Sequence, residues 1–264
     1  MLADERQSRI IELLREEGTV YTSDLVNRFQ TSRETIRRDL SELEQKGALK
    51  KVYGGATGTE ASSGGRPSVL APYEKRIREN LSDKESVAEA VLPFIREGMA
   101  IALDSSTTNL VIFRRLRKEF HNLHIITNSL PIAEELGERD EIEVVMLGGN
   151  LDRKEHCALG QVTLGQLRNY HADLYLMSCC GVTLRSGITD IGEGELQVKQ
   201  AMMEMAERTI LVCSHVRFGR ETLLRVCGTN AVSLIVTDGN LPEETKEMYE
   251  KEGMHIVCGP GGTI

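Results

Sequence analysis

The sequence lacks the long apolar runs and the leader that mark membrane and exported proteins. No stretch of its 264 residues reaches the roughly 18 consecutive apolar residues that a membrane-spanning helix needs. The first fifteen residues mix acidic and basic side chains and contain no apolar signal core. We therefore expect a cytoplasmic protein. A composition of 40% hydrophobic and 27% charged residues is typical of an ordinary globular chain.

Paired cysteines are also missing. The six cysteines form no Cys-x-x-Cys pair, and most lie in apolar, strand-like runs, so we expect buried free thiols. The adjacent pair His156 and Cys157 is weak support for a metal, because a structural zinc site needs four ligands. We predict no metal site, and nothing in the sequence indicates a cofactor.

An excess of positive charge, the usual mark of a nucleic-acid binder, is absent as well. The net charge is −8, but residues 1–54 hold ten Lys and Arg against ten Asp and Glu. The rest of the chain therefore carries all of the excess negative charge. Any contact with DNA must come from a local basic cluster in the neutral N-terminal part.

Three apolar stripes in this N-terminal part predict three helices. The first helix spans about 4–17, and the second follows Thr22 and Ser23. The third is expected to begin at Thr31, where Thr31 and Glu34 have the spacing of a capping box, and to end at Gly47. Its buried stripe consists of Ile36, Leu40 and Leu43.

The last two helices have the spacing of a helix-turn-helix, whose second helix reads base edges with its N-terminal residues. Hydroxyl and guanidinium groups suit that task. The expected DNA contacts on the helix are Ser32, Arg33, Thr35, Arg37 and Arg38. The basic segment 48–56 suits a β-wing that adds Lys50, Lys51 and Tyr53. The alternative is a plain solvated helix face, because Glu34, Asp39, Glu42 and Glu44 dilute the positive charge.

Residues 57–72 are rich in Gly, Ser and Thr and predict a linker between a domain of residues 1–56 and a second domain of residues 73–264. The second domain alternates apolar strands with amphipathic helices, which predicts an α/β fold with a mostly parallel sheet covered on both faces. Strands are expected at 99–103, 123–127, 142–147, 174–180, 209–213, 232–237 and 255–258. Helices are expected at 83–96, 108–120, 130–138, 161–169, 193–207 and 242–251.

A hydroxyl-rich loop between the first of these strands and its helix predicts an anion site. A strand, a loop of hydroxyls and a helix N-terminus together present N–H and O–H donors, whereas a simple helix cap needs one hydroxyl. The loop consists of Asp104, Ser105, Ser106, Thr107 and Thr108.

Other loops at strand ends are expected to join the same cleft, although each also suits an ordinary turn. They supply Asn128, Ser129, Gly148, Gly149, Arg153 and Gly181, with the Gly187 loop completing the wall. Glu195 and Lys199, four residues apart on a helix, form either a solvated ion pair or part of this site.

Two segments of the N-terminal part resemble the DeoR family of repressors. They are residues 32–40, Ser-Arg-Glu-Thr-Ile-Arg-Arg-Asp-Leu, and residues 49–56, Leu-Lys-Lys-Val-Tyr-Gly-Gly-Ala, where the family commonly has histidine in place of Tyr53. The resemblance covers nearly all of the chain. It implies a winged helix-turn-helix plus a Rossmann-like domain similar to ribose-phosphate isomerases, with a sugar phosphate as inducer, double-stranded operator DNA as partner and a homodimer or homotetramer. It also places Glu195 and Lys199 near the effector.

The chain departs from the family pattern at three sensor positions. Ser106 replaces a usual glycine, while Ser214 and Arg217 replace a usual Asp and Lys. Arginine still holds a phosphate, but the loss of the carboxylate and the titratable amine argues against enzymatic turnover. We therefore predict a non-enzymatic repressor of a carbohydrate operon. The alternatives are a sugar-phosphate isomerase with an accessory helical head and an acidic interaction module without DNA contact.

Overall fold

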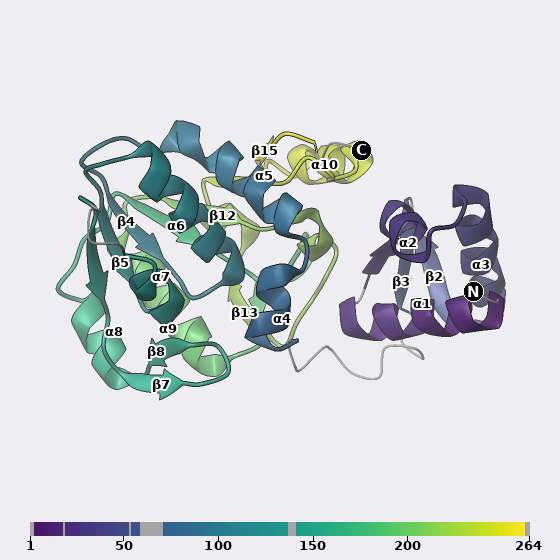
Figure 1. The fold of residues 1–264 in the computed structure, drawn as a ribbon, viewed down its shortest axis with the longest axis horizontal. Helices are drawn as coiled ribbons and strands as arrows, with labels where there is room; N and C mark the ends of the chain where they lie inside the picture. Colours follow the sequence, from purple (N-terminus) through teal and green to yellow (C-terminus); the bar gives the residue numbers. More distant parts are fainter. Residues whose placement is uncertain (1–2, 18, 53, 59–70, 137–140, 262–264) are drawn as a thin grey trace.

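The computed structural model of the chain describes residues 3–17, 19–52, 54–58, 71–136 and 141–261. Residues 3–58 form a small head and residues 71–261 a larger body, which lie side by side (Figure 1). Among the described residues, no helix is long and apolar enough to cross a membrane.

The head consists of three helices packed on a small antiparallel sheet. The helices are α1 (Ala3–Glu17), α2 (Thr22–Phe29) and α3 (Arg33–Gln45). The strands β1 (Thr19–Tyr21), β3 (Gly55–Gly58) and β2 (Leu49–Val52) pair in that order. Ile36, Leu40 and Leu43 are buried in the head core, which confirms the stripe predicted for the third helix.

The start of α3 differs by one residue from the prediction. Thr31 does not cap the helix; its backbone N–H donates to the carbonyl oxygen of Val26 in the turn that follows α2. Ser32 is the N-cap, and its Oγ accepts a hydrogen bond from the N–H of Thr35 at 3.1 Å.

The predicted wing is the antiparallel pair β2–β3. Gly55 lies so close to β1 that a Cβ atom there would stand 2.0 Å from the carbonyl oxygen of Val20, so only glycine fits. Strand β3 continues the head to Gly58. Tyr53 and residues 59–70 of the expected linker lie outside the described residues.

The body contains the predicted parallel sheet. All seven expected strands form it, in the order β15-β14-β12-β9-β4-β5-β6, and every neighbouring pair is parallel. Their bounds are β4 Ala100–Leu103, β5 His124–Thr127, β6 Glu143–Met146, β9 Leu174–Met177, β12 Thr209–Val212, β14 Leu234–Thr237 and β15 Ile256–Cys258. The hairpin β7–β8 (Asn150–Asp152, Cys157–Leu159) and a sheet of β10 (Gly181–Thr183), β11 (Gly187–Asp190) and β13 (Leu224–Cys227) flank it.

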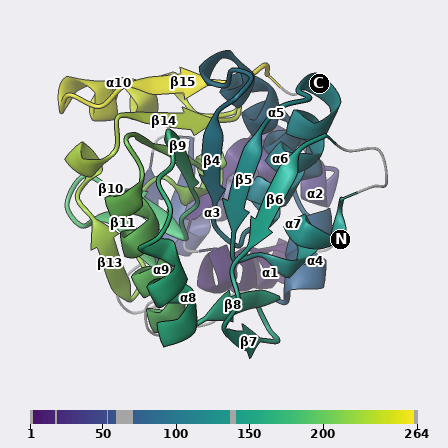
Figure 2. The ribbon, with the colours of Figure 1, turned by 90° about the vertical axis from the view of Figure 1, so that its left-hand side faces the viewer.

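Helices cover both faces of this sheet, as predicted (Figure 2). One face packs against α5 (Leu81–Val91), α6 (Thr107–Glu119) and α7 (Leu130–Glu134). The other packs against α8 (Gln161–Leu167), α9 (Glu193–Met205) and α10 (Glu243–Lys251). The cysteines are free, as expected, and four are buried; Cys227 is half-buried and Cys258 is exposed, because it ends the edge strand β15.

The order of the strands defines a crevice between β4 and β9. From β4 the chain winds outward to β5 and β6, and from β9 it winds the opposite way to β12, β14 and β15. The loops after β4 and β9 therefore diverge, which leaves an opening at the carboxyl ends of these two strands. Open α/β sheets bind their ligands at such a switch point.

Candidate functional site

The recognition surface predicted on the head faces away from the body. Helix α3 lies on the far side of the head in Figure 1. Ser32, Arg33, Arg37 and Arg38 are exposed and Thr35 is half-buried, while Lys50 and Lys51 are exposed on β2. This surface combines hydroxyls and cations in the arrangement that phosphate and base contacts need.

Acidic side chains dilute this surface less than the sequence suggests. Asp39 is buried, and its Oδ2 accepts from Nε of Arg6 at 2.5 Å, an ion pair that fastens α3 to α1. Glu42 accepts from Nε2 of Gln7 at 2.6 Å, and Glu44 accepts from the backbone N–H of Lys51 at 2.7 Å. Three of the four carboxylates therefore serve contacts within the head, two of them to α1 and the third to the wing.

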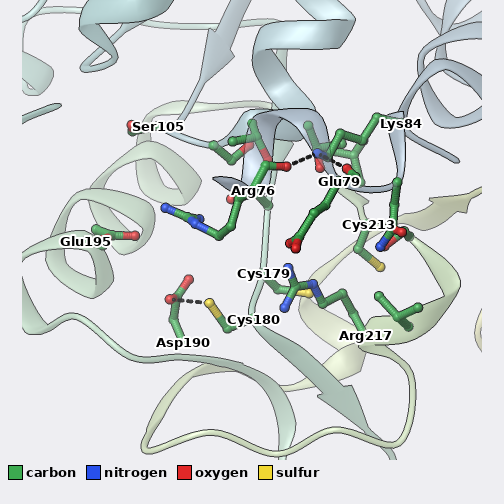
Figure 3. A pocket seen from close by; sticks show the side chains of 18 residues that line it. Arg76, Glu79, Lys84, Ser105, Cys179, Cys180, Asp190, Glu195, Cys213 and Arg217 are labelled. Atoms are coloured by element: carbon green, nitrogen blue, oxygen red, sulfur yellow. Dashed lines mark hydrogen bonds between the residues drawn. The ribbon is translucent and has the colours of Figure 1, made fainter. Parts of the chain in front are cut away.

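A pocket occupies the switch point of the body (Figure 3). Its narrow part of about 80 Å³ shares five lining residues with a wider cavity of about 670 Å³ between body and head. Together they have the size of a small-molecule site, roughly 300–1,000 Å³. The narrow part is lined by Arg76, Glu79, Asn80, Lys84, Ser105, Ser106, Thr107, Thr108, Ser178, Cys179, Cys180, Asp190, Glu195, Val212, Cys213, Ser214, Val216 and Arg217.

Three cations converge on this pocket from different elements. Arg76 belongs to α4 (Tyr73–Arg78), Lys84 to α5, and Arg217 to the 3-10 turn η2 (His215–Arg217). Nζ of Lys84 donates to the carbonyl oxygen of Glu79 at 2.7 Å. Burial, together with the positive charge of Arg217, lowers the pKa of Lys84 to about 8. An anion beside Lys84 would stabilise its charged form, which burial disfavours, so an anion in the pocket would be bound favourably.

The hydroxyl loop completes the anion cradle. Ser106 caps α6, since its Oγ accepts from the N–H of Asn109 at 3.0 Å. Thr107 and Thr108 open the helix, so their N–H groups belong to the first turn, which has no partners within the helix. Cations and a helix N-terminus on one cavity are the donors that a phosphate group requires.

A buried charge cluster lies beneath the cradle. Lys199 is 2% exposed, and its Nζ donates to Oδ2 of Asp104 at 2.7 Å and to the carbonyl oxygen of Ser178 at 2.8 Å. It also lies 3.3 Å from Oδ2 of Asp190. Although burial alone lowers the pKa of Lys199, the two carboxylates hold it above its ordinary value, so the lysine stays charged.

Glu195 gives the pocket a second kind of polar group. Burial and the negative charge of Asp190 raise the pKa of Glu195 to about 8. Its carboxyl therefore holds its proton to a higher pH than an exposed glutamate does, and in that form it is able to donate a hydrogen bond to a ligand oxygen. In Figure 3, Asp190 and Glu195 lie to the left, and Lys84 and Arg217 to the right.

The structure brings together only some of the predicted effector residues. The pocket is lined by Ser105, Ser106, Thr107, Thr108, Glu195 and Arg217. Asp104 and Lys199 lie beneath this lining, where they pair with each other.

The remaining predicted residues have other contacts. Asn128 is a support, since its Oδ1 accepts from the N–H of Ser105 at 3.1 Å, and Ser129 is fully buried beside it. Gly149 packs against α8, where a Cβ atom would stand 2.1 Å from Oγ1 of Thr163. Gly148, Arg153, Gly181 and Gly187 also lie outside the narrow pocket's lining.

Several lining residues escaped the sequence reasoning. Arg76 and Lys84 precede the sheet and carry no strand-end signal, although the basic run of residues 75–78 after the linker points to the former. The loops after β9 and β12 contribute the others, chiefly Ser178, Cys179, Cys180 and Cys213, which read as buried strand residues.

A winged helix-turn-helix head, joined to an α/β body with a pocket at its switch point, is the architecture of a DNA-binding protein with a separate ligand-binding domain. The DeoR-like helix-turn-helix domain matches residues 6–61, and the DeoR C-terminal sensor domain matches residues 79–239. The chain belongs to the DeoR family of transcriptional regulators.

Relatives cover nearly the full length of the chain. A putative aga operon transcriptional repressor of Escherichia coli O157:H7 is 32% identical over 96% of this chain and 93% of its own. The glycerol-3-phosphate regulon repressor of Escherichia coli K12 is 28% identical over 92% of this chain and 93% of its own. The L-fucose operon activator of the same strain is 30% identical over 88% of this chain and 94% of its own.

Solved structures also align with part of the chain. Ribose 5-phosphate isomerase A from Neisseria gonorrhoeae aligns with a TM-score of 0.39 and 16% identity, over 52% of this chain and 53% of that one.

Proposed function

We propose that this regulator represses a carbohydrate-utilisation operon and that a phosphorylated sugar, bound in the switch-point pocket, changes its affinity for operator DNA. The observation that carries this is the convergence of Arg76, Lys84 and Arg217 on the N-terminus of α6. The protonated carboxyl of Glu195 suits a sugar hydroxyl at the other side of the same pocket. Relatives of the chain are named as a repressor of the aga operon, a repressor of the glycerol-3-phosphate regulon and an activator of the L-fucose operon, which supports this proposal.

A thermal-shift screen tests the pocket. The panel is glucose 6-phosphate, ribose 5-phosphate, fructose 1-phosphate and glycerol 3-phosphate, each beside its unphosphorylated parent. We expect at least one phosphate ester to stabilise the protein and its neutral parent to have little effect. Equal shifts from ester and parent would contradict an anion site. An operator gel shift with and without the selected ester then shows whether the sugar phosphate weakens or strengthens DNA binding.

Two further proposals concern assembly and catalysis. A homodimer or homotetramer formed through the body would place two heads on two half-sites, because symmetric operators match symmetric proteins; light scattering measures the assembly. The protein is proposed to act in the cytoplasm. We also propose that the pocket binds a sugar phosphate without converting it. Incubation with glucose 6-phosphate and ribose 5-phosphate, the two aldose phosphates of the panel, while ketose formation is followed tests this, and product formation would favour the isomerase alternative.

A further inference from the structure

The head contacts the body at the side chain of His215. The ring centroids of Tyr21, at the end of β1, and His215 lie 5.2 Å apart. The Tyr21 hydroxyl donates to the His215 carbonyl oxygen at 3.4 Å, and Oδ2 of Asp24 on α2 lies 3.7 Å from Nε2 of His215. Tyr21 and His215 are 7% and 3% exposed, so the contact excludes water.

The body holds the other side of the same imidazole. Nδ1 of His215 lies 2.9 Å from Oδ1 of the fully buried Asp238 and 3.8 Å from Oδ2 of Asp83. Asp238 also accepts from the backbone N–H of His215 at 2.7 Å. Burial alone lowers the pKa of His215, but its hydrogen bond to Asp238 and the negative charges of Asp238 and Asp24 raise it to about 10. The protonated ring therefore donates from one nitrogen to the body and from the other toward the head.

His215 begins the same 3-10 turn that carries the pocket cation Arg217. The turn is short and internally bonded, since the N–H of Phe218 donates to the carbonyl oxygen of His215 at 3.1 Å and that of Arg217 to Ser214 at 3.0 Å. Val216 and Arg217 line both the narrow pocket and the wider cavity beside the head. Arg217 and His215 are therefore two residues apart in one internally bonded turn.

We propose that His215 is a positioning residue that couples the effector pocket to the orientation of the head. This coupling rests on the proposed function, because it requires an anionic effector at Arg217. An effector changes DNA affinity only if it prefers one arrangement of the head over another. The His215 contact with Tyr21 and Asp24 exists only in the docked arrangement of the head. An effector bound to Arg217 acts on this contact through the turn that Arg217 and His215 share.

The test compares operator affinity with and without the ester that gives the largest thermal shift in the panel above. Fluorescence anisotropy at fixed salt gives both dissociation constants for the full-length parent and for Asp24→Asn, Tyr21→Phe and His215→Gln. In the parent we expect the ester to change the constant by roughly 5- to 150-fold, the usual range of allosteric coupling. In the three variants we expect this ratio to fall toward one, while the thermal shift by the ester persists.

Two controls separate coupling from folding. Asp24→Glu keeps the carboxylate and is expected to retain part of the ratio of the two dissociation constants. His171→Gln, at an exposed histidine paired with Glu207, is expected to leave this ratio unchanged. Variants that weaken DNA binding equally in both states, with an unchanged ratio, would make the contact purely structural and overturn the coupling alone. A parent that binds operator but ignores all four esters would overturn the proposed effector together with the coupling.

Discussion

Replacing Lys199 by methionine tests whether the buried charge cluster beneath the pocket stabilises the body. Methionine keeps most of the apolar stem and removes the ammonium group, which donates to Asp104 and Ser178 and lies 3.3 Å from Asp190. Two carboxylates, both 2% exposed, then remain in the interior without their cation. Breaking a buried ion pair on one side typically costs about 3–5 kcal/mol.

The cost is measurable by unfolding. Because a loss of 1 kcal/mol lowers Tm by roughly 2–4 °C in a domain of this size, Lys199→Met is expected to lower Tm by roughly 6–20 °C. Urea denaturation without any ligand gives the free energy directly. Lys118→Met, at an exposed position of α6, is the matched control and is expected to stay within about 0.5 kcal/mol of the parent.

A second substitution tests whether the buried charges depend on each other. Asp104→Asn added to Lys199→Met removes one uncompensated carboxylate, so the double variant is expected to be more stable than the sum of the single losses. Strict additivity, or a loss below about 1 kcal/mol for Lys199→Met alone, would refute the view that these charges depend on each other.

Three further predictions concern binding. Arg37→Ala is expected to weaken operator binding by about 1–3 kcal/mol in a gel-shift titration at fixed salt; Arg168→Ala on the body is the control, and an unchanged constant would remove Arg37 from the DNA contacts. Thr107→Ala is expected to abolish the response to the ester without changing operator affinity, and equal thermal shifts of variant and parent would contradict this. Lys84 is charged below its pKa of about 8, so the affinity for the ester, measured by calorimetry, is expected to fall as the pH rises through 8. The phosphate group has a second pKa near 6 and therefore stays dianionic over this range. The same fall in affinity in Lys84→Met would exclude Lys84 as the cause.

The head and the sheet follow from local patterns in the chain. Apolar side chains at helical spacing, as at Ile36 and Leu40, bury one stripe wherever the helix packs. Each apolar run of strand length became a strand of the parallel sheet, because short runs separated by amphipathic helices have no other way to bury both faces. The exact start of α3 did not follow from the sequence, because Thr31 and Ser32 both have side chains that suit an N-cap. Ser32 is the cap, since the backbone N–H of Thr31 donates to Val26 in the turn after α2.

The site depended on contacts between distant segments. From the sequence, Asn128 and Ser105 are equal candidates for lining a polar cleft. In the structure only Ser105 lines the pocket, and Asn128 holds it in place by accepting a hydrogen bond from its backbone N–H. Lys199 suits either a solvated pair with Glu195 or a place in the site, and only its contact with Asp104, 95 residues earlier, shows it to be a buried charge beneath the pocket.

The sequence by itself determined the seven strands of the parallel sheet, the helices that cover them, where the basic helix of the head begins to within one residue, and which loop carries the hydroxyls. These are properties of neighbours along the chain, and periodicity and capping chemistry report them. The sequence did not indicate the short helix α4 or the strands outside the parallel sheet, β7, β8, β10, β11 and β13. Only the tertiary structure decided that Arg76 and Lys84 complete the pocket and that His215 joins head to body. Such contacts arise where the strand order reverses and where two domains meet, and no local pattern encodes which distant side chains arrive there.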